Sequence, residues 1–219
     1  RVIREYLKNN ILVTDGAMGT YYSEITGEES TVSERANRLD PETIVKIHRQ
    51  YIEAGARLLR TNTFSVNKIT LNMREEEIKD LIRRGYNIAC RAAAESSEEI
   101  FIAADFGPIP DTDTNNIERE SEEIIDEYKM LIDTFIEMGA EIFLFETFSS
   151  PEYLSEISSY IKSRNKDSFI ITQFALSLNG YTRKGYSAES IIREIKNINS
   201  IDAFGFNCGV GPVHLNNIM

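Results

Sequence analysis

Six short segments of the chain are continuously apolar rather than alternating between apolar and polar residues. Continuous runs of Ile, Leu and Phe are typical of strands that are covered on both faces, as in parallel sheets. We therefore predict buried strands at residues 11–16, 58–64, 100–107, 141–148, 168–176 and 203–209.

Between these segments, apolar residues recur three or four positions apart, which is the spacing of a helix with one buried face. Asp40 and Pro41 open the first such pattern as N-cap and first helical residue, and Gly55 ends it. The spacing predicts five helices, over residues 40–55, 78–93, 121–139, 150–161 and 187–198. Strand and helix thus alternate along the chain, which indicates βαβ units and a parallel sheet.

Two α/β architectures have this alternation, an open doubly wound sheet and a closed (β/α)8 barrel. The first strand-to-helix turn, DGAMGT, lacks the GxGxxG pattern of dinucleotide-binding sheets. Polar residues follow nearly every strand, which suits a barrel whose site is ringed by strand ends. However, about six strand–helix units are two fewer than a barrel needs. The chain has no linker or low-complexity tract, so we predict a single domain over residues 1–219.

Composition narrows the classes of function. The 219 residues include 24 basic and 35 acidic side chains, for a net charge of −11, and no cluster of Lys and Arg stands out. This charge argues against partners such as nucleic acids and anionic membranes. No run is apolar enough to span a membrane, and no signal peptide is present. With only two cysteines, the chain is predicted to be cytoplasmic. Because it does not begin with Met, we expect it to be part of something longer.

Ligands of parallel α/β folds bind at the carboxyl ends of the strands. No lysine lies inside a predicted strand, which excludes a Schiff-base aldolase. His48 and His214 lie on or near helices, so a nucleophilic Ser or Cys lacks its base. We expect His48 to lie on the surface.

Three carboxylates remain at the strand ends: Asp15, Asp105 and Glu146. They could hold Mg²⁺, as in a magnesium-dependent barrel lyase or hydrolase, or they could cap turns and pair with Arg60. Glu146 lies between Phe145 and Phe148, and an unpaired buried carboxylate is costly. It therefore needs a cationic partner, either Arg60 or the ammonium group of a ligand, and the residues alone leave both open.

Cysteines in apolar surroundings are usually small buried hydrophobic residues, and Cys90 on its helix fits that interpretation. Cys208 differs because it stands at a strand end between Asn207 and Gly209. One thiolate alone does not make a zinc site, which needs three or four ligands.

Taken together, four motifs resemble the homocysteine S-methyltransferase family, in particular the homocysteine-binding module of cobalamin-dependent methionine synthase. These motifs are DGAMGT, EAGARLLRTNTF, GAEIFLFETF and GFNCGVGP, in order between residues 11 and 212. The resemblance implies a (β/α)8 TIM-type barrel, incomplete in this chain and truncated at the C-terminus. It also implies transfer of a methyl group to homocysteine to give methionine.

The resemblance further implies a Zn²⁺ held by three cysteine thiolates, the first of which matches Cys208. The other two form a Cys-Cys pair that this chain does not contain, so we expect the chain alone to be inactive. No catalytic residue is implied beyond the zinc site, since the metal removes the thiol proton. Three cysteine thiolates donate electron density to the zinc ion, so a substrate thiolate bound to it stays nucleophilic. The homocysteine sulfur takes the fourth coordination position of the zinc.

Amino-acid recognition is implied residue by residue. Asp15 and Glu146 match acidic residues near the amino group of homocysteine, and Asn207 matches the neighbour of the zinc cysteine. Gly16 and Thr61 match positions at the carboxylate end of the pocket.

Thr63 and Asp105 match lining positions with a weaker claim. The resemblance leaves two methyl donors open, methylcobalamin with methyl-folate or S-methylmethionine.

The predicted barrel is two strands short of closure, so its exposed strand edges could pair with another molecule and lead to self-association. A non-catalytic amino-acid-binding module is the remaining alternative.

Overall fold

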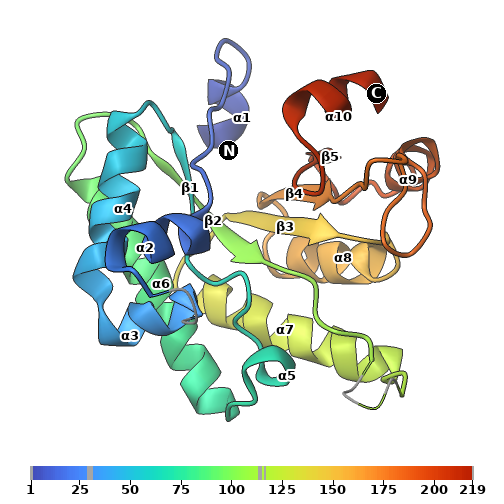
Figure 1. Ribbon diagram of the computed structural model, residues 1–219, viewed down its shortest axis with the longest axis horizontal. Coiled ribbons are helices and arrows are strands. Elements are labelled where there is room, and N and C mark those ends of the chain that lie inside the picture. Colours follow the sequence, from blue (N-terminus) through green and yellow to red (C-terminus); the bar gives the residue numbers. More distant parts are fainter. Residues whose placement is uncertain (1, 29–31, 113–114, 116, 219) are drawn as a thin grey trace.

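The strands of the structure form one parallel sheet and alternate with helices (Figure 1). The computed structural model describes residues 2–28, 32–112, 115 and 117–218. Its elements are, in chain order, α1 (Val2–Tyr6), α2 (Met18–Thr26), the 3-10 helix η1 (Ser33–Arg35), α3 (Ala36–Leu39), α4 (Pro41–Glu53), β1 (Leu58–Arg60), α5 (Lys68–Leu71), α6 (Glu75–Ala94), β2 (Phe101–Phe106), α7 (Ser121–Glu137), β3 (Ile142–Phe148), α8 (Leu154–Arg164), β4 (Phe169–Phe174), α9 (Ala188–Ile195), β5 (Ala203–Phe206) and α10 (Pro212–Ile218).

The order of the strands in the sheet is their order in the sequence, β1-β2-β3-β4-β5, and each pair is parallel. A doubly wound sheet would reverse direction at a switch point, whereas a barrel adds each new strand beside the last. The chain therefore forms an incomplete (β/α)8 barrel, which confirms the predicted fold class. Helices α6, α7 and α8 cover its outer face (Figure 1).

The prediction of a strand over residues 11–16 is wrong. Only Thr14 forms a bridge, in parallel with Leu58, and the rest of the segment is irregular. The segment has a neighbour on one side only, and Ile11 and Val13 are 87% and 51% exposed. Without cover on both faces, its apolar side chains cannot supply the burial that a buried strand needs. The segment still lies beside β1, where the prediction put it.

The predicted helices are confirmed, with differences at their ends. The Asp40 side chain accepts a hydrogen bond from the backbone N–H of Thr43 at the start of α4, and Ser187 caps α9 by accepting from Ser190. Helix α8 begins at Leu154 rather than near Ser150, because residues 151–153 form a turn that precedes it. The short helices α1, α2, α3, α5 and α10 carry too few periodic residues to be predicted.

Alternate residues of each strand point to the inner face of the sheet. The inner face at the amino ends is apolar and is covered by α1, whose Ile3 packs against it and whose Tyr6 ring lies 5.2 Å from that of Phe101. Continuing along the same face, the next inward positions at the carboxyl ends are Arg60 on β1, Asp105 on β2 and Glu146 on β3. Strand alternation therefore brings these three charged groups together on one side of the sheet.

His48 does not lie on the surface, contrary to the prediction. It is fully buried on α4, and neither ring nitrogen has a hydrogen-bond partner among the described residues. The helix packs two adjacent faces, against α6 and against α2, so a position that looks polar on the helical wheel is enclosed. Burial, together with the nearby charge of Arg60, lowers the pKa of His48 to about 4.

Substituting His48→Leu is expected to remove an acid sensitivity of the fold. The folded-state pKa lies below the unfolded value, so the unfolded chain binds more protons and stability falls as the pH drops from about 6.5 to about 4. Lowering the pKa of His48 to about 4 corresponds to a loss of about 3 kcal/mol in the free energy of unfolding over this pH range. Urea denaturation at both pH values would measure it. His214→Leu, at an exposed position on α10, is the matched control, and an equal change in both variants would contradict the assignment.

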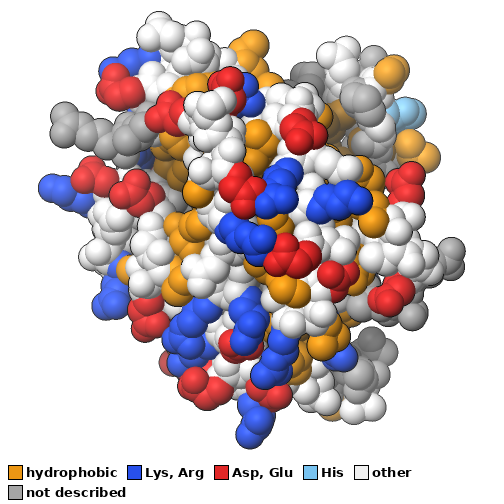
Figure 2. All heavy atoms as spheres, turned by 90° about the vertical axis from the view of Figure 1, so that its left-hand side faces the viewer, with side chains coloured by type: hydrophobic (Ala, Val, Ile, Leu, Met, Phe, Trp, Pro, Cys, Tyr) orange, Lys and Arg blue, Asp and Glu red, His pale blue; other side chains and the backbone are white. Residues whose placement is uncertain are grey.

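Acidic and basic side chains are interspersed over the helical face that Figure 2 shows. Oppositely charged side chains of the helices form ion pairs, such as Arg91 with Glu42 and Arg84 with Asp80. Within the described part of the chain, every helix is too short or too polar to cross a membrane.

Candidate functional site

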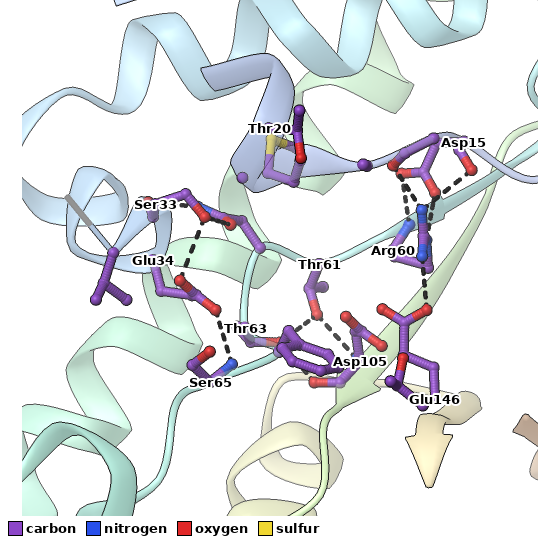
Figure 3. Close-up of a pocket in the computed structure, with 18 of the residues that line it drawn as sticks. Asp15, Thr20, Ser33, Glu34, Arg60, Thr61, Thr63, Ser65, Asp105 and Glu146 are labelled. Carbon is purple, nitrogen blue, oxygen red and sulfur yellow. Dashed lines mark hydrogen bonds and ion pairs between the residues drawn. The ribbon is translucent and has the colours of Figure 1, made fainter. Parts of the chain in front are cut away.

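Arg60 connects two of the carboxylates that the sequence singled out (Figure 3). Its Nε lies 2.7 Å from Oδ1 of Asp15, and its Nη1 lies 2.6 Å from Oε2 of Glu146. Its Nη2 donates to the backbone oxygens of Asp15 and Gly16, at 3.1 and 2.5 Å. Of the two cationic partners left open for Glu146, the structure thus supplies Arg60.

Burial dominates the electrostatics of this ion-pair cluster. The side chains of Asp15, Glu146 and Arg60 are 2%, 8% and 20% exposed. Burial raises the pKa of Asp15, although the charge and hydrogen bonds of Arg60 oppose the shift. Burial alone would lower the pKa of Arg60, but the charges of Asp15 and Glu146 outweigh it and the pKa rises. Arg60 is therefore a permanent cation here.

Asp105 stands between Arg60 and Glu146 in the order of the strands, and its backbone is held by two threonines. Its N–H donates to Oγ1 of Thr61 at 3.0 Å, and its carbonyl oxygen accepts from Oγ1 of Thr63 at 2.8 Å. Because Thr63 gives its hydrogen to Asp105, Thr61 must be the donor in the 2.7 Å contact between the two hydroxyls. The Thr61 hydroxyl therefore has no hydrogen left for a ligand.

The end of β5 is tied to the end of β3 by the amide of Asn207. Its Oδ1 accepts from the backbone N–H of Thr147 at 3.0 Å, and its Nδ2 lies 3.2 Å from Oε2 of Glu146. The same nitrogen lies 3.5 Å from the sulfur of Cys208. Asn207 thus links the carboxylate cluster to the thiol.

The backbone at these strand ends is unusual. Thr147 and Cys208 have φ values of 64° and 57°, in the left-handed region that non-glycine residues seldom occupy. The register between β3 and β4 shifts between Phe145 and Phe148, so Thr147 lies in a bulge that turns it toward β5. Cys208 is exposed, whereas Cys90 is half-buried against the core.

A cavity of about 690 Å³ opens at the carboxyl ends of the strands. Of the predicted site residues, those that line it are Asp15, Gly16, Thr61, Thr63, Asp105, Glu146 and Cys208. Asn207 lies behind this lining and acts through its contacts with Glu146 and Thr147.

The opposite wall of the cavity was not predicted. It comes from α2, η1 and the loop after β1, and it includes Ser33, Glu34 and Ser65 (Figure 3). Glu34 is 5% exposed, and its Oε1 accepts from the backbone N–H of Ser65 at 2.7 Å. In the sequence Glu34 lies in a hydrophilic stretch without strand or helix periodicity, so only its place in space marks it.

The described residues do not make a zinc site by themselves. Among them, no group of three or more His, Cys, Asp or Glu side chains is placed to hold a metal. Cys208 supplies one thiol, and a catalytic zinc ion needs three protein ligands. Arg60 holds Asp15 and Glu146, and no metal-binding group forms among the described residues, so the structure likewise gives no support to a magnesium centre on Asp15, Asp105 and Glu146.

Comparison with known sequences places the chain in a family. The pattern that defines the homocysteine S-methyltransferase family matches residues 12–219. Methionine synthase of Mycobacterium leprae (strain TN) is 27% identical over 228 residues, covering 96% of this chain and 19% of that protein. Methionine synthase of Mycobacterium tuberculosis (strain ATCC 25618 / H37Rv) is 25% identical with the same coverage. The chain thus spans 19% of the length of each of these two curated relatives.

Solved structures agree on the fold. The metallated form of the homocysteine methyltransferase MmuM from Escherichia coli superposes with a TM-score of 0.80 at 16% identity, over 100% of this chain and 81% of that one. Its apo form gives 0.78 at 20% identity, over 100% and 80%. With the family pattern covering nearly all of the sequence, the chain belongs to the homocysteine S-methyltransferase family.

Proposed function

We propose that this chain is the homocysteine-binding part of a methyltransferase that converts homocysteine to methionine. The observation that carries the proposal is the arrangement of charge and thiol in the cavity. Four carboxylates line it, and Arg60 is the one Lys or Arg among the lining residues. The excess of negative charge favours a ligand that brings an ammonium group.

Within this proposal, Asp15 and Glu146 contribute negative charge to the wall of the cavity that the amino group faces, which we call the negative wall, and Arg60 keeps both side chains in place. Gly16 and Thr61 line the cavity, and we propose that they lie beside the carboxylate of the ligand. Because the hydroxyl hydrogen of Thr61 points at Thr63, Thr61 shapes the pocket rather than donating to the ligand. Asn207 orients the end of β5 that carries Cys208.

The thiol end of the cavity is where we propose the methyl group is accepted. Cys208 would be one ligand of a zinc ion whose other ligands lie outside the described residues. Zinc, when bound, supplies deprotonation of the substrate thiol at neutral pH. The residues of this chain hold the amino acid by its charged end, so that its sulfur lies toward Cys208. The methyl donor, a small molecule or a separate donor domain, is not specified by these residues.

Calorimetric titration of this chain with L-homocysteine and with 4-mercaptobutanoate, which lacks the ammonium group, tests the proposal. We expect the second ligand to bind at least about tenfold more weakly, since a charged hydrogen-bonded group contributes about 1.5–3 kcal/mol. Glu146→Gln should reduce this preference, whereas Glu122→Gln, at an exposed position of α7, should leave it unchanged. Equal binding of both ligands, or of neither, would contradict the proposal.

A further inference from the structure

Within the negative wall, the two oxygens of Asp15 are already engaged. Oδ1 accepts from Nε of Arg60 at 2.7 Å, and Oδ2 accepts from the backbone N–H of Arg60 at 2.9 Å. Arg60 also binds the backbone oxygens of Asp15 and Gly16. A guanidinium therefore lies where a ligand ammonium would have to approach Asp15, and Arg60 remains charged throughout.

Asp105 is in the opposite situation. Its side chain lines the cavity and the residue is only 3% exposed, yet Oδ1 has no hydrogen-bond partner among the described residues. Its neighbour Glu146 is a second acceptor, so the two carboxylates can bond to each other only through a proton. An unpaired buried acceptor destabilises the folded protein, and a ligand donor placed there would remove that cost.

We infer that Asp105, together with Glu146, contacts the ammonium group of the ligand, while Arg60 is a positioning residue that reserves Asp15 for the framework. The inference rests on the proposed function and assigns the ammonium position within it. Asp105 and Glu146 occupy inward positions on adjacent strands β2 and β3 and lie side by side in the cavity (Figure 3). An ammonium group between them would supply the donor that Oδ1 of Asp105 lacks among the described residues, and would add one to Glu146.

A proton accompanies this contact. Burial, and next the charge of Glu146, raise the pKa of Asp105 well above its usual range. The other charged groups that act on Asp105 are Arg60 on β1 and Asp15 on the edge segment, while Glu34 and Cys208 line the same cavity. The raised pKa means that the Asp105 carboxyl keeps its proton to a higher pH than an ordinary aspartate, and an arriving ammonium displaces that proton into solvent. Affinity for such ligands should therefore rise with pH until the Asp105 carboxyl ionises.

The experiment uses this chain, with a chelator present, and L-methionine as the probe, because methionine has no thiol proton to confuse the balance. Titration calorimetry in buffers of different ionisation enthalpy counts the protons released. We expect methionine binding to release protons from the wild-type chain and none from Asp105→Asn, which keeps the shape of the side chain but carries no charge. Affinity should fall about tenfold or more in the variant, in line with loss of a charged hydrogen bond.

Two controls separate this role from a structural one. Binding of 4-(methylthio)butanoate, which lacks the ammonium group, should be equal in wild type and Asp105→Asn. Asp167→Asn, at an exposed position before β4, should behave like wild type. If methionine binds the wild type and Asp105→Asn with the same affinity and the same proton release, the inference is overturned and the proposed function stands. If the wild-type chain binds no α-amino acid, both are overturned.

Discussion

Replacing Cys208 with serine is expected to abolish zinc binding and methyl transfer in a protein extended beyond residue 219 to the length of a complete barrel, roughly 250 residues or more. Cys208 is the one cysteine among the described residues that line the cavity. Loss of an outer partner of a metal ligand typically costs about 10–100-fold in affinity or activity, so loss of a ligand itself should cost more than about 100-fold. Zinc content by elemental analysis should fall from one per chain to near zero.

The matched control for this substitution is Cys90→Ser, because Cys90 is half-buried on α6 against the core and away from the cavity. It should retain zinc. The 219-residue chain is expected to bind zinc poorly, as wild type and as either single variant. An extended protein that keeps its zinc without Cys208, or that turns over with Mg²⁺ alone, would rule out the thiolate mechanism and point back to the carboxylates.

The second large effect concerns stability. Arg60→Met is expected to lower the free energy of unfolding by about 3 kcal/mol, because removing the cation leaves two buried carboxylates without their partner. This value is the lower end of the stability losses typical for removing one partner of a buried ion pair, because the Arg60 side chain is 20% exposed. Urea denaturation at neutral pH would measure the loss. Arg91→Met, which breaks an exposed pair with Glu42, should change stability little.

The loss in Arg60→Met should shrink at acidic pH. Burial already raises the pKa of Asp15 in the folded protein, and without Arg60 the shift grows. A raised folded-state pKa means that the folded chain binds more protons than the unfolded chain, so stability falls as the pH rises through that range. Wild type and variant should therefore converge as the pH is lowered toward about 4, the ordinary value for a carboxyl group. A loss that is independent of pH would contradict the ion-pair account.

The sequence determined the class of fold because periodicity is a local property. Continuous apolar runs and helical spacing predicted all five strands of the sheet and the helices α4, α6, α7, α8 and α9 without any knowledge of neighbours. Prediction from the sequence failed where the burial of a residue depends on which other elements pack around it. Residues 11–16 are apolar but lack cover on one side, and His48 is polar but enclosed by two helices.

The same division holds for the site. Strand alternation and the rule that parallel sheets bind ligands at their carboxyl ends were enough to gather Asp15, Asp105, Glu146 and Cys208 at one rim. Only the tertiary structure decided which hydrogen-bond and ion-pair partners these side chains have. In the tertiary structure Arg60 pairs with Asp15 and Glu146, and Oδ1 of Asp105 has no donor among the described residues. Glu34, from a stretch without periodicity, lies in the opposite wall of the cavity. Hydrogen-bond pairing depends on distances of a few ångströms between residues far apart in the chain, and no local pattern encodes those.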